Sequence, residues 1–210
     1  EFGRRPTGMY IPRFRNLNNE VGQSKFVRGY NFQSWGEGRT PPVNTDGFGV
    51  ELKKNLRKPG PWRLPLHAFC EILPKKENRI LLDEKKVDRF GIPQVKFEFQ
   101  WSQNEIDMLK DASEQAELML RGAGCVDIQR RDVQSAPGTG IHEMGGARMG
   151  DNPKNSVVNR FGQMHDASNL FISDGSIMTS ASCVNPSITY MALTARAANH
   201  AVDLIKLNKI

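Results

Sequence analysis

One of the four histidines lies where a reacting group could approach it closely, in the run IHEMGGARMG. This is His142, and the glycines around it are Gly140, Gly145, Gly146 and Gly150. Glycine lets a ligand or a second chain segment come close to the backbone. Imidazole accepts and releases protons near neutral pH, so this position suits a general base. The alternative is a loop histidine that only forms hydrogen bonds.

A second candidate site lies near the C-terminus, in the segment SDGSIMTSASCVNPSIT. Asp174 and Gly175 end a short apolar run, and small residues lead from there to Asn185. Asn185 as N-cap and Pro186 as the first helical residue are typical of a helix start. The unpaired N–H groups and the partial positive charge of such a start suit an anionic ligand. The alternative is a well-capped helix without a ligand.

Most of the strands that must position these residues are predicted before residue 101. The first 63 residues are rich in Gly, Pro, Asn and Arg and predict long loops with one short strand at Phe48–Leu52. Further strands are predicted at Leu64–Leu73, Arg79–Asp83 and Gln94–Gln100. In the last of these, apolar and charged residues alternate. This alternation indicates a sheet with one polar face and favours antiparallel pairing.

Two helices are predicted in the rest of the chain. Ser102 and Glu105 have the spacing of a capping box, and apolar residues follow at helical spacing until Gly122. The second helix runs from Pro186 to about Leu207. Its apolar stripe consists of Ile188, Met191, Ala192, Ala195, Ala198, Ala201, Val202 and Ile205. Two more short strands are predicted between the helices, at Cys125–Gln129 and Leu170–Ile172.

The positive charge of the chain is concentrated near its start. The formal net charge is +6 at pH 7, and the first 60 residues hold 11 Lys and Arg against 5 Asp and Glu. This basic stretch, which includes Arg4, Arg5, Arg13 and Arg15, either faces phosphates or an acidic partner or is a solvated loop surface. Because its basic residues do not interleave with aromatic residues in a patch, no nucleic-acid binding is expected. No apolar run reaches the roughly 18 residues that cross a bilayer.

No metal site is predicted. The three cysteines, Cys70, Cys125 and Cys183, lie far apart and lack Cys-x-x-Cys spacing, so we expect reduced, structural thiols. The other histidines, His67, His165 and His200, are expected to be structural or solvated.

Four short motifs occur in order through the last third of the chain. They are H-x-x-G-G-x-x-M-G from His142, V-V-N-x-x-x-Q from Val157, N-L-F-I-x-D-G-S from Asn169 and N-P-S-x-T from Asn185. This series resembles the C-terminal half of the glucose–methanol–choline (GMC) family of FAD-dependent oxidoreductases. The opening GRRPTGMYIPRFRN and the span NRILLDEKKVDRFGIPQVKF resemble the substrate domain of the same family.

The resemblance implies an α+β fold in two parts. Residues 1–150 are expected to form the substrate-binding domain, a mostly antiparallel sheet with helices. Residues 151–210 are expected to supply the C-terminal strand and helix of the FAD-binding domain. The family's phosphate-binding turn, G-x-G-x-x-G, is missing, since GTGIHE lacks the third glycine. We therefore expect a C-terminal portion that works with an N-terminal FAD-binding region of the same polypeptide and binds FAD weakly or not at all alone.

The resemblance also implies roles for individual residues in the oxidation of a small-molecule alcohol or sugar. His142 is implied as the general base, and Asn185 as the donor of a hydrogen bond to the same substrate oxygen. The cofactor-binding residues implied for FAD are Asp174, Gly175, Asn185, Pro186 and Ser187. A competing hypothesis is a non-catalytic substrate-binding or interaction module whose loop residues never meet a flavin.

Overall fold

The computed structural model describes residues 8–17, 24–35, 46–131 and 134–210. Arg4 and Arg5 of the basic stretch lie outside the described residues. The chain divides into two compact units. The first comprises Glu1–Cys70 with Met108–Arg130, and the second comprises Glu71–Asp107 with Arg131–Ile210. In both sheets of the described residues the paired strands are antiparallel, and the chain also contains helices. This confirms the α+β class for the described residues.

A three-stranded antiparallel sheet lies at the centre of the first unit. Its order is β1 (Met9–Ile11), β2 (Tyr30–Ser34) and β3 (His67–Cys70). β3 lies inside the strand predicted at Leu64–Leu73, which is confirmed. β1 and β2 fall where loops are predicted, and that prediction is wrong there. Their alternation extends over only three and five residues, which is too short to be evident beside the surrounding glycines and asparagines.

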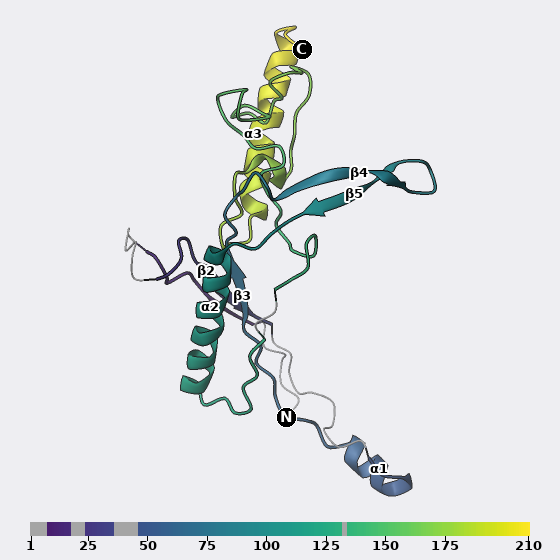
Figure 1. Ribbon diagram of the computed structural model, residues 1–210, viewed down its shortest axis with the longest axis vertical. Helices are drawn as coiled ribbons and strands as arrows, with labels where there is room; N and C mark the ends of the chain where they lie inside the picture. The colour runs from purple at the N-terminus through teal and green to yellow at the C-terminus, as the bar shows by residue number, and fades with distance from the viewer. Residues whose placement is uncertain (1–7, 18–23, 36–45, 132–133) are drawn as a thin grey trace. The chain divides into compact units, whose positions relative to one another are not determined.

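One face of this sheet packs against helix α2 (Gln103–Gly122), which lies beside β2 and β3 in Figure 1. Tyr30 and Phe32 point to this face and are fully buried, together with Met108 and Ala112 of the helix. Because side chains alternate along a strand, these two aromatic residues share one side of β2. These buried side chains of β2 and α2 form the core of the first unit.

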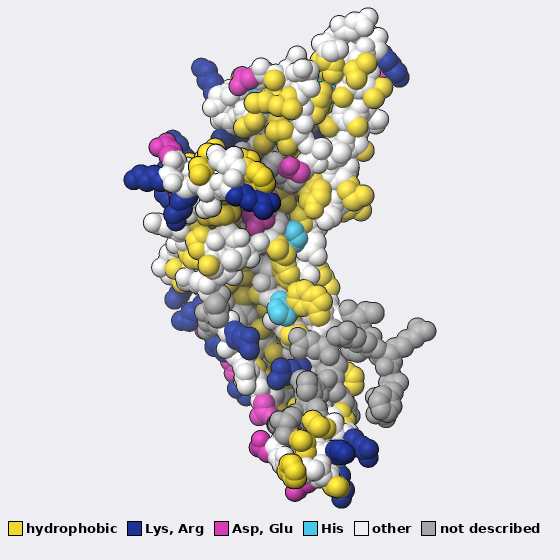
Figure 2. All heavy atoms as spheres, turned by 90° about the vertical axis from the view of Figure 1, so that its right-hand side faces the viewer, with side chains coloured by type: hydrophobic (Ala, Val, Ile, Leu, Met, Phe, Trp, Pro, Cys, Tyr) yellow, Lys and Arg dark blue, Asp and Glu magenta, His cyan; other side chains and the backbone are white. Residues whose placement is uncertain are grey.

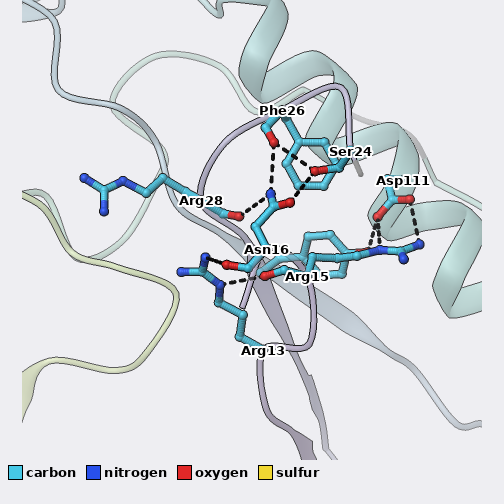
Figure 3. A network of polar contacts seen from close by, with 8 residues as sticks. Arg13, Arg15, Asn16, Ser24, Phe26, Arg28 and Asp111 are labelled. Carbon is cyan, nitrogen blue, oxygen red and sulfur yellow. Dashed lines mark hydrogen bonds and ion pairs between the residues drawn. The ribbon is translucent and has the colours of Figure 1, made fainter. Parts of the chain in front are cut away.

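A polar network ties the sheet and the preceding loop to α2. The Arg15 guanidinium donates two hydrogen bonds to the Asp111 carboxylate, at 2.9 and 3.0 Å (Figure 3). The Tyr30 hydroxyl donates to the same carboxylate. Burial, reinforced by the hydrogen bond to Asp111, raises the pKa of Tyr30. Asn16 holds the loop itself, since its amide donates to the carbonyls of Phe26 and Arg28.

The strand predicted at Phe48–Leu52 is wrong, because this segment is helix α1 (Gly49–Leu56). Its Glu51 lies in the first turn and Lys53 and Lys54 lie in the last, an arrangement that complements the helix dipole. Leu, Glu and Lys are also better helix formers than strand formers.

The second unit contains an antiparallel hairpin of β4 (Arg79–Val87) and β5 (Pro93–Glu98). The strands predicted at Arg79–Asp83 and Gln94–Gln100 are thus confirmed, although β4 continues four residues further. The polar face predicted from the alternation carries an ion pair in which Arg79 and Glu98 lie 2.9 Å apart. The opposite face carries the cross-strand pairs Ile80 with Phe97 and Leu82 with Val95, all four residues being exposed.

The predicted capping box at the start of α2 is confirmed. The backbone N–H and the hydroxyl of Ser102 both donate to the Glu105 carboxylate, the N–H at 2.9 Å. Glu105 is 2% exposed, and it also accepts the Leu73 N–H at 3.3 Å. Burial opposes ionisation of this carboxyl, but the hydrogen bonds from Ser102 and Leu73 outweigh it and lower the pKa of Glu105.

Two short strands predicted between the helices are wrong. Residues 125–129 form no strand, and residues 170–172 form only a single bridge, between Phe171 and Gln163. Both runs are too short to define a strand by pattern alone. The last element is helix α3 (Ser187–Lys206), which confirms the predicted C-terminal helix.

The apolar stripe predicted on α3 is exposed. Ala197 is the one buried residue among those described on this helix, whereas Ile188 is 79% and Met191 66% exposed. Val202 and Ile205 continue the stripe and are also exposed. Figure 2 shows hydrophobic side chains on the surface towards the top of the view, the region that α3 occupies in Figure 1. None of the helices in the described part of the chain has the length and hydropathy that a bilayer-crossing segment requires.

Candidate active site

His142 lies in the loop between residues 134 and 150, in the second unit. Its side chain is half-buried, and its backbone has φ of 65°, in the left-handed region. Few residues other than glycine adopt this conformation, although His, Asn and Asp do so more often than most. A residue held there costs of order 1–3 kcal/mol, and such residues cluster at ligand-binding and catalytic sites.

The loop that carries His142 is fixed to the turn that carries Asp174. The N–H groups of Gly145 and Ala147 both donate to the Ser176 carbonyl at 3.1 Å, and the Met149 N–H donates to the Ile177 carbonyl at 2.7 Å. Gly145 has φ of 86°, a conformation that glycine adopts at no steric cost. The two predicted site segments are therefore joined by three backbone hydrogen bonds.

The turn itself is a short 3-10 helix, η1 (Gly175–Ile177), with Asp174 as its N-cap. The Asp174 carboxylate accepts the Ser176 N–H at 2.8 Å. The hydrogen bonds from the side chain and the backbone of Ser176 lower the pKa of Asp174. This exposed carboxylate is consequently ionised near neutral pH, and it is suited to accept a further hydrogen bond from a hydroxyl group.

Gly175 lies in a crowded position between two other parts of the site. A Cβ built on Gly175 would lie 2.9 Å from the Met144 sulfur and 3.5 Å from the Tyr190 ring. Met144 belongs to the His142 loop and Tyr190 to the first turn of α3. The turn after Asp174 therefore lies between the His142 loop and the start of α3, and a side chain at position 175 would displace the end of the Met144 side chain.

The start of α3 differs by one residue from the prediction. The N-cap is Pro186, whose carbonyl accepts the N–H groups of Thr189 and Tyr190, and the first helical residue is Ser187. Asn185 is therefore not the N-cap but the residue before it. Proline has no backbone N–H, so none is left without a partner at this position. Asn185 is exposed, and the N-cap residue Pro186 forms no side-chain hydrogen bond.

Sequence reasoning missed the residues that connect the predicted site segments. Ser176 supplies the carbonyl that holds the His142 loop, and Met144 and Tyr190 fill the space where a side chain at position 175 would lie. The available signal was the D-G-S sequence, which predicts a turn with an Asp cap. The spacing of the motifs does not predict which chain segment forms hydrogen bonds with this turn. That the His142 ring and the Asn185 amide converge on one pocket stays a prediction.

Two other histidines have contacts within the second unit. The His165 ring nitrogen Nε2 lies 3.0 Å from the Ser156 hydroxyl and 3.1 Å from the Gly150 carbonyl. The His200 ring stacks on Phe161 with the centroids 3.9 Å apart. Both hold the segment between residues 150 and 172 in place, against α3 in the case of His200. No group of metal-ligating side chains occurs within the described ranges.

Comparison with known proteins identifies the class to which this site belongs. The family model described as GMC oxidoreductase matches residues 74–194. This range includes both loops of the candidate site and the first part of α3. The chain therefore belongs to the GMC oxidoreductase family, as the motifs predict.

Three relatives illustrate the range of the family. The chain is 31% identical to a 2-methyl-1,2-propanediol dehydrogenase from Mycolicibacterium austroafricanum, over 83% of this chain and 33% of that protein. It is 29% identical to the fructose dehydrogenase large subunit of Gluconobacter japonicus, over 75% of this chain and 28% of the relative. It is 25% identical to the gluconate 2-dehydrogenase flavoprotein of Pantoea cypripedii, over 89% and 32% respectively. The chain thus spans about a third of the length of these relatives.

Proposed function

We propose that the complete protein oxidises the CH–OH group of an alcohol or sugar, with FAD as the hydride acceptor, and that this chain supplies the substrate-side residues. Family membership supports an oxidoreductase, because the similar proteins are named as dehydrogenases and oxidases. The observation that carries the proposal is the set of backbone hydrogen bonds between the His142 loop and the 175–177 turn. It keeps the proposed base beside the segment that leads to Asn185.

His142 is proposed to take the proton of the substrate hydroxyl. Oxidation of an alcohol removes one proton from oxygen and a hydride from carbon, so a base must meet the oxygen while the carbon faces the acceptor. The hydrogen bonds of Gly145, Ala147 and Met149 hold the loop from which the His142 ring projects, and a base must be held in position. Asn185 is proposed to donate its amide N–H to the same oxygen and so to orient the substrate.

The start of α3 and Asp174 are proposed to hold the cofactor. FAD supplies the hydride acceptor when bound. The N-cap residue of α3 forms no side-chain hydrogen bond, and the first turn has no acidic residue, so the N–H groups and the dipole of this helix start favour an electron-rich group such as the flavin ring. The Asp174 carboxylate is proposed to accept a hydrogen bond from a ribityl hydroxyl. It would not bind a phosphate, because the two negative charges would repel each other. Asn185, Pro186 and Ser187 adjoin the helix start, and Gly175 adjoins Asp174.

The remainder of the polypeptide is proposed to cover the apolar stripe of α3. The spacings along the stripe alternate between three and four residues, and all of its members at these positions are exposed: Ile188, Met191, Ala195, Ala198, Val202 and Ile205. Such a stripe needs an apolar partner surface. We propose that this partner is the dinucleotide-binding region found in the family, with residues 1–150 as the substrate domain and 151–210 as part of the flavin domain.

Absorbance of the isolated chain tests whether FAD binding requires the rest of the polypeptide. Purified alone, the 210-residue chain is expected to be colourless, because a helix start and one turn can contact only part of FAD. Addition of FAD should produce no more than weak binding in equilibrium dialysis. A yellow protein with about one equivalent of flavin would contradict the proposed arrangement.

Anaerobic reduction of the complete protein tests the function itself. Small alcohols, diols and sugars would each be mixed with the flavin-loaded protein, and loss of the oxidised flavin absorbance would be followed. At least one of these donors is expected to bleach the flavin. If the complete protein binds no flavin, or if no donor reduces it, the alternative of a non-catalytic substrate-binding or interaction module would be correct.

A further inference from the structure

A tight turn lies just before His142 in the chain. It consists of Ala136, Pro137, Gly138 and Thr139. The Thr139 N–H donates to the Ala136 carbonyl at 3.2 Å, and the Thr139 hydroxyl donates to the same carbonyl at 2.6 Å. Proline at the second position and glycine with positive φ at the third are typical of a type II turn, and φ of Gly138 is 79°. The chain is therefore closed on itself a few residues before the proposed base.

This turn lies against the ring of Phe97, in strand β5. A Cβ built on Gly138 would lie 3.0 Å from two atoms of the Phe97 ring and 3.2 Å from a third. Glycine is therefore required at position 138 for two reasons, its positive φ and the closeness of the ring. Phe97 and the turn both belong to the second unit. The contact thus joins the hairpin to the His142 loop within one compact unit.

Phe97 differs from its neighbours on the apolar face of the hairpin. It is 44% exposed, whereas Val95 on the same strand is 55% exposed. The facing residues Ile80 and Leu82 are 59% and 64% exposed. Side chains two positions apart on a strand point to the same side, so Val95 and Phe97 share this face. The lower exposure of Phe97 accords with its cover by the turn.

The end of the hairpin that carries Phe97 is itself held by several contacts. The neighbouring Glu98 carboxylate pairs with Arg79 of the facing strand at 2.9 Å. Beyond the strands, the Gln100 N–H donates to the Asn78 side-chain oxygen at 2.9 Å, and the Asn78 amide donates back to the Gln100 carbonyl at 3.3 Å. Exposed ion pairs contribute little individually, but these reciprocal hydrogen bonds close the ladder beside the ring. Phe97 is therefore carried by a paired strand, which holds a side chain more precisely than a loop does.

His142 lies between this contact and a second one. The Ser176 carbonyl accepts the N–H groups of Gly145 and Ala147, which follow the histidine in the chain. Gly138, which Phe97 contacts, precedes it. A catalytic group must be held to within about 0.5 Å of its productive position. Support on both sides of the base restricts it more than support on one side alone.

We propose that Phe97 is a positioning residue for His142. Its ring supports the turn before the base, as the Ser176 carbonyl holds the chain after it. Phe97 acts through the turn at Gly138 and takes no part in proton transfer, since a phenyl ring has no group that gives or takes a proton. The inference rests on the proposed function, in which His142 is the base.

Stopped-flow reduction of the flavin-loaded complete protein, with the concentration of a sugar or diol donor varied, tests the proposal. Phe97→Ala is expected to lower the limiting rate of flavin reduction about 10- to 100-fold, because a small misplacement of a reacting group is costly. The donor concentration that gives half the limiting rate should stay within about twofold, since binding before the reaction is not affected. Phe97→Tyr keeps the ring and should restore most of the rate.

Val95→Ala is the matched control. Val95 lies on the same strand and the same face, but the three atoms nearest to a Cβ on Gly138 all belong to Phe97. Val95→Ala should therefore keep the parent rate. Equal losses in Val95→Ala and Phe97→Ala would overturn the inference, because the whole hairpin face would then be responsible. So would a higher half-saturating donor concentration at an unchanged limiting rate, which would make Phe97 a binding residue.

Gly138→Ala tests the same contact from the other side. Its Cβ would meet the Phe97 ring at 3.0 Å, so this variant should also reduce its flavin more slowly. In the double variant with Phe97→Ala the ring is absent, so the combined loss should be smaller than the product of the single losses. Losses that simply multiply would contradict the proposal. Phe97→Leu replaces Phe97→Ala in these measurements if the alanine variant does not fold.

Hydrogen exchange followed by mass spectrometry does not depend on the redox reaction. The Thr139 N–H reports on the turn, because it donates to Ala136. Peptides that cover residues 136–142 should exchange about fivefold faster or more in Phe97→Ala and at the parent rate in Val95→Ala.

The two readouts separate the inference from the proposed function. If no donor reduces the flavin, the proposed function fails, and hydrogen exchange still decides whether Phe97 supports the turn. Parent-like exchange in Phe97→Ala would overturn the inference. Faster exchange with an unchanged reduction rate would also overturn it, because Phe97 would then support the turn without positioning the base.

Discussion

The Asp111 carboxylate offers the sharpest test of how the first unit is held together. Asp111→Ala removes the acceptor of two Arg15 hydrogen bonds and of the Tyr30 hydroxyl. Tyr30 is fully buried, so its hydroxyl would lose its partner away from water, at a cost of about 1–3 kcal/mol. Arg15 and Asp111 are about a third and a quarter exposed, and their ion pair adds only about 1 kcal/mol. The variant is therefore expected to lose about 2–4 kcal/mol of unfolding free energy.

A double-mutant cycle separates the two parts of this loss. Tyr30→Phe alone removes one hydrogen bond and should cost about 1 kcal/mol. In the double variant no hydroxyl is left without a partner, so the total cost should be smaller than the sum of the single costs by about 1–2 kcal/mol. Urea denaturation followed by circular dichroism would give all four free energies. Additive costs, to within about 0.5 kcal/mol, would refute the reasoning, because Tyr30 would then not depend on Asp111.

Two further predictions concern the pH dependence of stability. The pKa of Glu105 is lowered from 4.5, so its contribution is present above that pH and is lost as the pH falls below it. Glu105→Gln should therefore be less stable than the parent at pH 7 and should lose less stability between about pH 5 and pH 3 in thermal melts. The pKa of Tyr30 is raised above 10.0, so the stability it contributes is lost as the pH rises above that value. The free energy of unfolding of Tyr30→Phe should consequently fall less than that of the parent as the pH rises above this value. The same pH profile in both proteins would contradict the burial argument.

The sequence predicted those elements whose signals are local. The capping box of Ser102 and Glu105 satisfies backbone donors within one turn, so it could be identified without any knowledge of the rest of the fold. The hairpin could be predicted for a similar reason, since Val95 and Phe97 alternate with Lys96 and Glu98 along one strand. Both predictions concern residues that lie within a few positions of their partners.

The sequence failed where distant residues decide the structure. β2 becomes a central strand because Phe32 and Tyr30 pack on α2, about 80 residues away in the chain. Helix α1 has no buried residue. Its apolar residues therefore do not mark a side that packs in the core, and the strand predicted from them is wrong. At the site, the motifs identified His142, but the carbonyl of Ser176 that holds its loop emerged only from the fold.

Flavin reduction in His142 and Asn185 variants tests the central claim most directly. Stopped-flow mixing of the complete protein with its alcohol or sugar donor would be compared for the parent, His142→Ala, Asn185→Ala and the control His165→Asn. His165 is a half-buried histidine of the same unit, and its ring nitrogen lies within hydrogen-bond distance of the Ser156 hydroxyl and the Gly150 carbonyl. We predict that the first two variants keep their flavin but reduce it more slowly, by about 10²–10⁴-fold for His142→Ala, while the control stays near the parent rate. Near-parent rates in both site variants would contradict the account and leave His142 as a loop residue and Asn185 as the residue before a helix.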